Sequence, residues 1–163
     1  MLNVLAALLL AFLMTSPLRA QETTTLKTAE HPNLGQYLAG QAGLSIYLFE
    51  EDRREGERGR SVESDCHGDC LTRWPPVPGE PLPRAGTGIE ADLIGSFKRP
   101  DGKVQAMYNG WPLYYFADDF VAGDVNGHDF EEFGGEWYLL TPSGEQVPGS
   151  SGGDDDDDKD DDD

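Results

Sequence analysis

Tyr47-Leu48-Phe49-Glu50-Glu51-Asp52 and Tyr114-Tyr115-Phe116-Ala117-Asp118-Asp119 share the pattern Tyr-x-aromatic-x-x-Asp and lie 67 positions apart. In a β-strand the two aromatic residues of each copy, two positions apart, point to the same face. The Asp follows three residues later, where a strand gives way to a polar turn. Two copies, each preceded by an apolar stretch and followed by a glycine, indicate a duplicated β-unit.

Short apolar segments separated by turn signals continue through residues 34–147, the region assigned to the duplicated domain. Strands are predicted at residues 44–49, 94–99, 104–108, 111–116 and 136–140. Glycine and proline are frequent between these segments, and no long segment has the 3.6-residue period of an amphipathic helix. The sequence therefore predicts an all-β or β-dominated fold, with two related small β-units packed as one compact domain around one core.

Three stretches are not expected to form regular strands. Residues 21–33 are a polar lead-in with little to bury, and residues 50–63 are a charged, exposed loop. Residues 75–83 contain five prolines, which have no amide hydrogen to donate to a sheet. This last stretch is predicted to be an ordered connection that packs through Trp74.

The first twenty residues have the features of an export signal. An unbroken apolar run at residues 5–14 is too short to span a bilayer comfortably, and Ala20 suits signal-peptidase cleavage before Gln21. The segment before the run has no Lys or Arg, so a retained short membrane anchor is the alternative. We expect a cleaved signal, a periplasmic or extracellular location, and no transmembrane segment after cleavage.

The chain is strongly acidic, with a formal net charge of −19. Nine Asp and one Lys at residues 154–163 belong to a tail, residues 148–163, that is predicted to be disordered because it has little to bury. Outside the signal and this Asp run, 22 acidic side chains still outnumber 10 basic ones. Binding to nucleic acid or to an anionic membrane surface is therefore not expected, because both need basic patches.

Further blocks resemble a known family. They are Cys66-His67-Gly68-Asp69-Cys70 with Trp74-Pro75-Pro76, Arg99-Pro100-Asp101-Gly102, Tyr108-Asn109-Gly110-Trp111-Pro112-Leu113-Tyr114, Gly123-Asp124-Val125-Asn126-Gly127 and Gly135-Glu136-Trp137-Tyr138. With the doubled motif they resemble the predicted bacterial secreted proteins and lipoproteins called the secreted repeat of unknown function. The signature residues carried by the resemblance are Tyr47, Phe49, Asp52, Trp74, Tyr114, Phe116 and Asp119. The resemblance implies an architecture and an exported location, and no established activity. This chain lacks the lipobox Cys of many relatives and has a charged insertion at residues 53–60.

Cys66 and Cys70 are the two cysteines of the chain. In an oxidising compartment such a close pair is expected to form a disulfide. The alternative is a copper site, since thiolates suit Cu(I), with Cys66, His67 and Cys70 as ligands and His31 or His128 completing the set. Apart from this alternative, no cofactor is expected.

Most of the motif aromatics, with Trp74, Trp111 and Trp137, are expected to be core, because a small β-domain needs their apolar area. Stacking of these rings on a ligand is the alternative. Asp52 and Asp119 are expected at partly exposed turns, where they hold backbone amides. A hydrolase using these two carboxylates is a further alternative. The segment that begins at Asp124 is expected to be a solvated turn, because the twelfth position of a calcium loop would be Gly135. The predicted function is a non-enzymatic binding or envelope-associated module.

Overall fold

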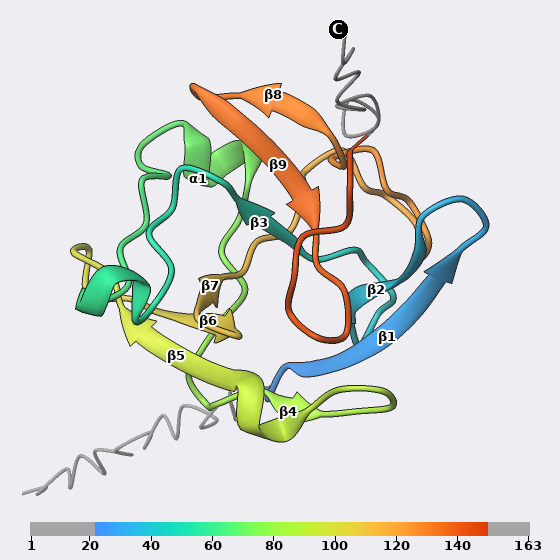
Figure 1. Ribbon diagram of the computed structural model, residues 1–163, viewed down its shortest axis with the longest axis horizontal. Coiled ribbons are helices and arrows are strands. Elements are labelled where there is room, and N and C mark those ends of the chain that lie inside the picture. Colours follow the sequence, from blue (N-terminus) through green and yellow to red (C-terminus); the bar gives the residue numbers. More distant parts are fainter. Residues whose placement is uncertain (1–21, 150–163) are drawn as a thin grey trace, which may run out of the picture.

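The computed structural model describes residues 22–149, which form three small sheets and almost no helix (Figure 1). The first sheet has the order β2-β1-β4, with β1 Thr25–His31, β2 Gly35–Gly40 and β4 Arg84–Ala85. The second has the order β3-β9-β8, with β3 Tyr47–Phe49, β8 Phe130–Glu132 and β9 Gly135–Leu139. The third has the order β5-β6-β7, with β5 Ile94–Lys98, β6 Val104–Tyr108 and β7 Trp111–Pro112. Short helical turns lie at α1 Cys70–Arg73, η1 Glu57–Gly59 and η2 Ala91–Leu93.

In both repeats a β-hairpin comes before the motif. The hairpin β1–β2 precedes the first motif, and the hairpin β5–β6 precedes the second. The motifs meet at Tyr47 and Tyr114, whose backbones exchange two hydrogen bonds of 2.9 and 3.0 Å. The prediction of a β-dominated domain made of two related units is confirmed. The predicted signal at residues 1–20 and most of the predicted tail lie outside the described residues.

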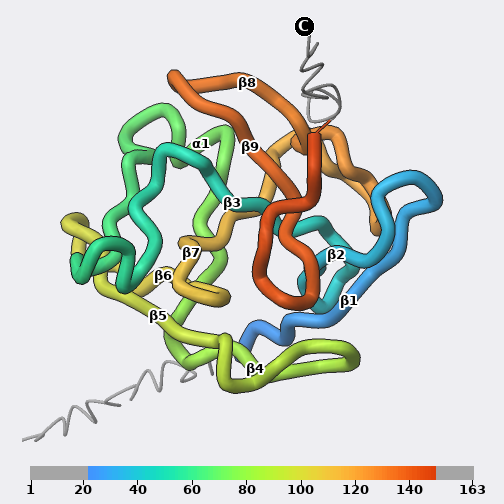
Figure 2. The backbone as a smooth tube through the Cα atoms, in the orientation of Figure 1, coloured from blue at the N-terminus to red at the C-terminus, as the bar shows by residue number. Residues whose placement is uncertain are grey.

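Each motif pairs with the end of the other repeat. Strand β3 lies antiparallel to β9, in the centre of the molecule between β9 and β7 (Figure 2). The second motif pairs with the proline-rich connection: Val77 N donates to Leu113 O at 2.9 Å, and Tyr115 N donates to Pro75 O at 2.8 Å. Pro75, Pro76 and Pro78 have no amide hydrogen to donate, so the connection forms isolated bridges rather than a regular strand. The predicted strand at residues 111–116 is accordingly reduced to β7 and single bridges.

The core consists of two clusters on opposite faces of the motif segments, where one core had been predicted. Alternation along β3 places Tyr47 and Phe49 in the first cluster and Leu48 in the second. The second motif behaves in the same way, with Tyr114 and Phe116 in the first cluster and Tyr115 packed against the second. The motif segments are thus buried on both faces, which their aromatic face alone did not indicate.

The segment expected to be a polar lead-in is largely strand β1. It pairs with β2 over six positions, from Leu26 opposite Gly40 to His31 opposite Gly35. Leu26 is fully buried in the second cluster. The strand was missed because this single large apolar side chain gives no alternating pattern. Its stability comes from the β2 ladder and from threonines, which favour extended backbone.

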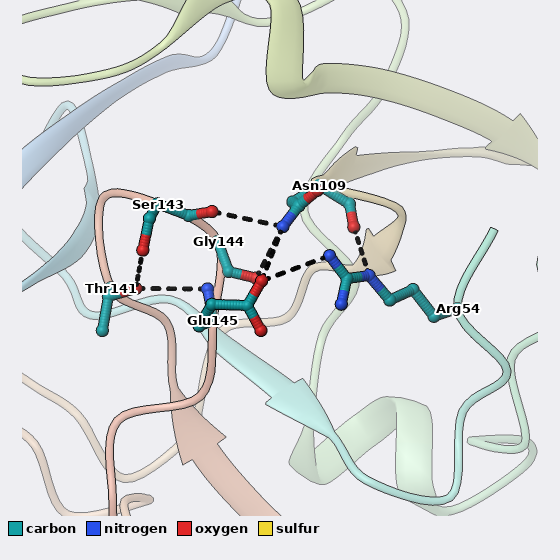
Figure 3. Close-up of polar contacts among 6 residues, drawn as sticks. All are labelled: Arg54, Asn109, Thr141, Ser143, Gly144 and Glu145. Atoms are coloured by element: carbon teal, nitrogen blue, oxygen red, sulfur yellow. Dashed lines mark hydrogen bonds and ion pairs between the residues drawn. The ribbon is translucent and has the colours of Figure 1, made fainter. Parts of the chain in front are cut away.

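The charged loop after the first motif is tied to two turns of the second repeat (Figure 3). Arg54 Nε donates to Asn109 O at 2.7 Å, and Asn109 Nδ2 donates to Glu145 Oε1 at 3.1 Å. Asn109 can serve this junction because it adopts a left-handed conformation with φ of 49°, which asparagine tolerates better than most residues. The insertion is therefore anchored at its start, although its charged side chains are mostly solvent-facing.

Candidate functional site

The signature tyrosines and aspartates form a reciprocal pair of contacts between the repeats, which we call the Tyr–Asp clasp. Tyr47 of the first motif donates its hydroxyl hydrogen to Asp119 Oδ2 of the second motif at 2.6 Å. Tyr114 of the second motif donates to Asp52 Oδ2 of the first motif, also at 2.6 Å. Each carboxylate therefore has its tyrosine partner in the other repeat. The two side-chain contacts are reciprocal, as are the backbone hydrogen bonds between Tyr47 and Tyr114.

Each carboxylate of the clasp also fixes the loop that follows its own motif. Asp65 N donates to Asp52 Oδ1 at 2.8 Å, and Asn126 N donates to Asp119 Oδ1 at 3.1 Å. The aspartates hold backbone amides, as their position after a strand suggested. They are not partly exposed, however: Asp52 is 3% exposed and Asp119 is 6% exposed. They are buried because the tyrosine of the other repeat reaches the second oxygen of each carboxylate.

Burial controls the protonation of the clasp. Removal from water raises the pKa of Asp52 from its usual 3.8 to about 7, against the opposing effect of the Tyr114 hydrogen bond. Burial also raises the pKa of Asp119. The pKa values of Tyr47 and Tyr114 are raised by burial and by their carboxylate partners, so both phenols remain protonated donors. Both halves of the clasp are thus set up as hydrogen bonds between a neutral phenol and a carboxyl group.

Four aromatic rings form a stacked column next to the clasp, in the order Phe49, Trp137, Trp74, Phe116. The central Trp74 and Trp137 rings lie 3.8 Å apart with an interplanar angle of 4°. Phe49 stacks on Trp137 at 4.3 Å, and Phe116 stacks on Trp74 at 4.2 Å. Each motif phenylalanine therefore stacks on the tryptophan of the other repeat. The column and the clasp join the two repeats through the same set of signature residues.

Arg99 extends the clasp on one side only. Its guanidinium is buried and donates to Ser64 Oγ at 2.8 Å and to the Cys66 carbonyl at 2.6 Å. Ser64 Oγ lies 2.7 Å from the Tyr114 hydroxyl, which in turn donates to Asp52. A buried cation and a buried carboxylate are thereby linked through two hydroxyl groups. All these partners are internal, so the network supports the fold around the first repeat's loop.

Cys66 and Cys70 form a disulfide whose Cα atoms are 5.4 Å apart. Both cysteines are buried in the first core cluster, beside the aromatic column. The disulfide closes the turn that leads into α1 and then Trp74. The disulfide therefore fixes the segment that carries Trp74, one of the two central rings of the column.

Replacing both cysteines with alanine is expected to lower the free energy of unfolding by roughly 2 kcal/mol, because the unfolded chain regains the entropy of a short closed loop. Urea denaturation of wild type and the Cys66→Ala/Cys70→Ala variant measures the difference. Reduction of the disulfide in the wild-type protein should also lower the free energy of unfolding. Equal unfolding midpoints for wild type and variant would contradict a stabilising role for the disulfide.

The alternative sites suggested by the sequence are not assembled in this structure. In residues 22–149, no three His, Cys, Asp or Glu side chains are grouped so that they could hold a metal ion. His67 is exposed, and both ring nitrogens of His128 contact backbone atoms of Leu139 and Pro148. The sulfur atoms are bonded to each other, so copper binding stays a prediction for the reduced protein. Asp52 and Asp119 face different tyrosines, and neither lines the surface cavities at Arg54, Tyr115, Leu71, Phe116 or Phe97.

A surface cavity of about 570 Å³ lies at the Phe116 end of the column. We call it the aromatic cup; its lining residues are Arg73, Phe116, Asp118, Phe120, Asn126 and Phe130. Sequence reasoning missed this cup, and it also missed the buried role of Arg99. The expectation that most of the aromatics are core holds for Trp74 and Trp137, which are both fully buried.

The fold and the clasp define a duplicated β-domain in which two sequence repeats interlock through a shared tyrosine–aspartate signature. The sequence matches the family described as "Secreted repeat of unknown function" over residues 28–78 and 95–141, one stretch in each repeat. The chain belongs to this family. No curated protein and no solved structure matches the chain significantly.

Proposed function

We propose that this protein is an exported, non-enzymatic binding module whose ligand contacts its surface rather than the Tyr–Asp clasp. The observation that carries the proposal is the use of the Tyr–Asp clasp: its hydroxyls and carboxylates all have internal partners and are buried. Chemistry on a substrate needs groups that reach it. In contrast, the aromatic cup is open to solvent and has the size of a small-molecule site.

The family description supports an exported location. The family is described as secreted. Within residues 22–149, no helix is both long and apolar enough to cross a membrane. The acidic composition, with a net charge of −19, supports partners other than nucleic acid and anionic lipid.

Cleavage of the export signal is expected to give a mature protein that begins at or near Gln21. The basis is the short apolar run that ends before Ala20. Intact-mass measurement of protein from the periplasm or the medium identifies this terminus. Recovery of the chain from the membrane fraction with Met1 retained would mean that the segment is an anchor instead.

A ligand screen tests the binding proposal. The 15N-labelled mature protein is titrated with neutral sugars, organic anions, organic cations and short peptides, and each compound is then checked for chemical change. The expected result is saturable chemical-shift change at surface residues, with the compound recovered intact. The hydrolase alternative would replace the proposal if a compound were converted and conversion stopped in Asp52→Asn or Asp119→Asn. The absence of binding by every class would also overturn it.

A further inference from the structure

Phe120 and Val121 are exposed apolar residues on an ordered loop. Phe120 is 78% exposed and Val121 is 63% exposed. The loop that carries them is fixed by Asp124, whose carboxylate accepts hydrogen bonds from Phe120 N at 2.8 Å and Val121 N at 3.0 Å. Gly123 N also donates to the Gly43 carbonyl at 3.2 Å. The backbone is therefore already organised while the apolar side chains face water, which is a feature of binding surfaces.

Phe120 forms one wall of the aromatic cup. Phe116 and Phe130 form the rest of its apolar lining, with ring centroids 5.6 Å apart. The carboxylate of Asp118 and the amide of Asn126 are the polar groups of the lining beside Arg73. A ligand in the cup would contact phenylalanine rings and also meet the polar groups of Arg73, Asp118 and Asn126. This lining favours a compact ligand with an apolar body.

The charge at the cup favours a cation. Arg73 forms ion pairs at 2.6 Å with Asp118, which lines the cup, and at 3.4 Å with Glu132, which lies next to it, so two carboxylates accompany one cationic side chain. The Arg73 guanidinium also lies over the Phe116 ring, 4.6 Å from its centroid. One ring of the cup thus already holds a cation on its face. The Phe120 and Phe130 rings can act in the same way toward a bound cation, because aromatic faces are electron-rich.

We propose that the aromatic cup binds a small organic cation, an ammonium or quaternary ammonium group joined to an apolar body. The cationic group lies against Asp118 and the faces of Phe120 and Phe130, and the apolar body covers the remaining ring surface. An organic anion is disfavoured because the two carboxylates outnumber the single Arg73 cation, and a neutral sugar would gain nothing from this excess of negative charge. This inference rests on the proposed binding function and specifies its ligand class.

Three matched probes test the ligand class: benzyltrimethylammonium, benzyl alcohol and benzoate. Each is titrated into the 15N-labelled mature protein at fixed ionic strength. Benzyltrimethylammonium is expected to bind at least tenfold more tightly than the other two, with shift changes at the cup residues. Tighter binding of benzyl alcohol or benzoate at the cup would overturn the cation class and leave the binding function standing. Binding of none of the probes, or binding away from the cup, would overturn the inference as well.

Two substitutions locate the site. Phe120→Ala and Asp118→Asn are each expected to weaken benzyltrimethylammonium binding at least fivefold. Phe120 is so exposed that its removal should leave the melting temperature nearly unchanged, which separates lost binding from lost folding. Phe133→Ala is the matched control, because Phe133 is also exposed, at 46%, and does not line the cup. Unchanged affinity in Phe120→Ala, or an equal loss in Phe133→Ala, would contradict the assignment.

Discussion

Replacing Trp137 with alanine is expected to lower the free energy of unfolding by about 3–5 kcal/mol, the usual cost of truncating a fully buried tryptophan. Trp137 is fully buried and stacks between Phe49 and Trp74. Its removal leaves a cavity in the middle of the column, where one repeat contacts the other. A domain of this size has a total stability of about 5–15 kcal/mol, so the variant should lose a large fraction of it.

Urea denaturation at constant pH measures the effect. Leu82→Ala is the matched control, because Leu82 is an apolar side chain that is 52% exposed. Leu82→Ala should change the free energy of unfolding by no more than about 0.5 kcal/mol. If Trp137→Ala cost no more than the control, the column would not be a principal source of stability.

Replacing Asp52 with asparagine is expected to remove a large pH dependence from the stability of the protein. Burial raises the pKa of Asp52 from 3.8 to about 7 in the folded state, so the folded protein holds this proton more tightly than the unfolded chain. The resulting stabilisation is fully present below pH 4 and is lost as the pH rises to about 7. A shift of this size corresponds to a loss on the order of 4 kcal/mol.

The comparison of wild type with Asp52→Asn isolates this group from the many other acidic residues. Asparagine can still accept the hydrogen bond from Asp65 N, and its amide can donate to the Tyr114 hydroxyl. Chemical denaturation between pH 4.5 and pH 8 should show wild type losing stability relative to the variant as pH rises. A difference that stays constant over this range would mean that Asp52 titrates normally.

The motif spacing predicted the local structure of the domain correctly. Two aromatic residues at alternate positions must share a strand face, and Tyr47 and Phe49 are indeed buried together in one cluster. The same holds for Tyr114 and Phe116. The duplication was visible because both copies keep the whole pattern. These features depend on local geometry, which a sequence pattern records directly.

The partner of each signature residue could not be predicted in the same way. A Tyr and an Asp five positions apart are consistent with a hydrogen bond inside one repeat, and spacing does not distinguish this from the observed contact between repeats. The burial of Asp52 and Asp119 depends on that long-range contact and was therefore missed. The aromatic cup was missed for a similar reason, because Arg73 and Phe120 come from different repeats.

Double-mutant cycles test most directly whether the clasp joins the two repeats. Tyr47→Phe is combined with Asp119→Ala, and Tyr114→Phe with Asp52→Ala, and the free energy of unfolding is measured for each single and double variant. The structure predicts coupling energies of about 1 kcal/mol or more for these pairs, because each loses a direct hydrogen bond of 2.6 Å. The pairs within one repeat, Tyr47 with Asp52 and Tyr114 with Asp119, should be additive to within about 0.5 kcal/mol. Strong coupling within the repeats and none between them would contradict the clasp.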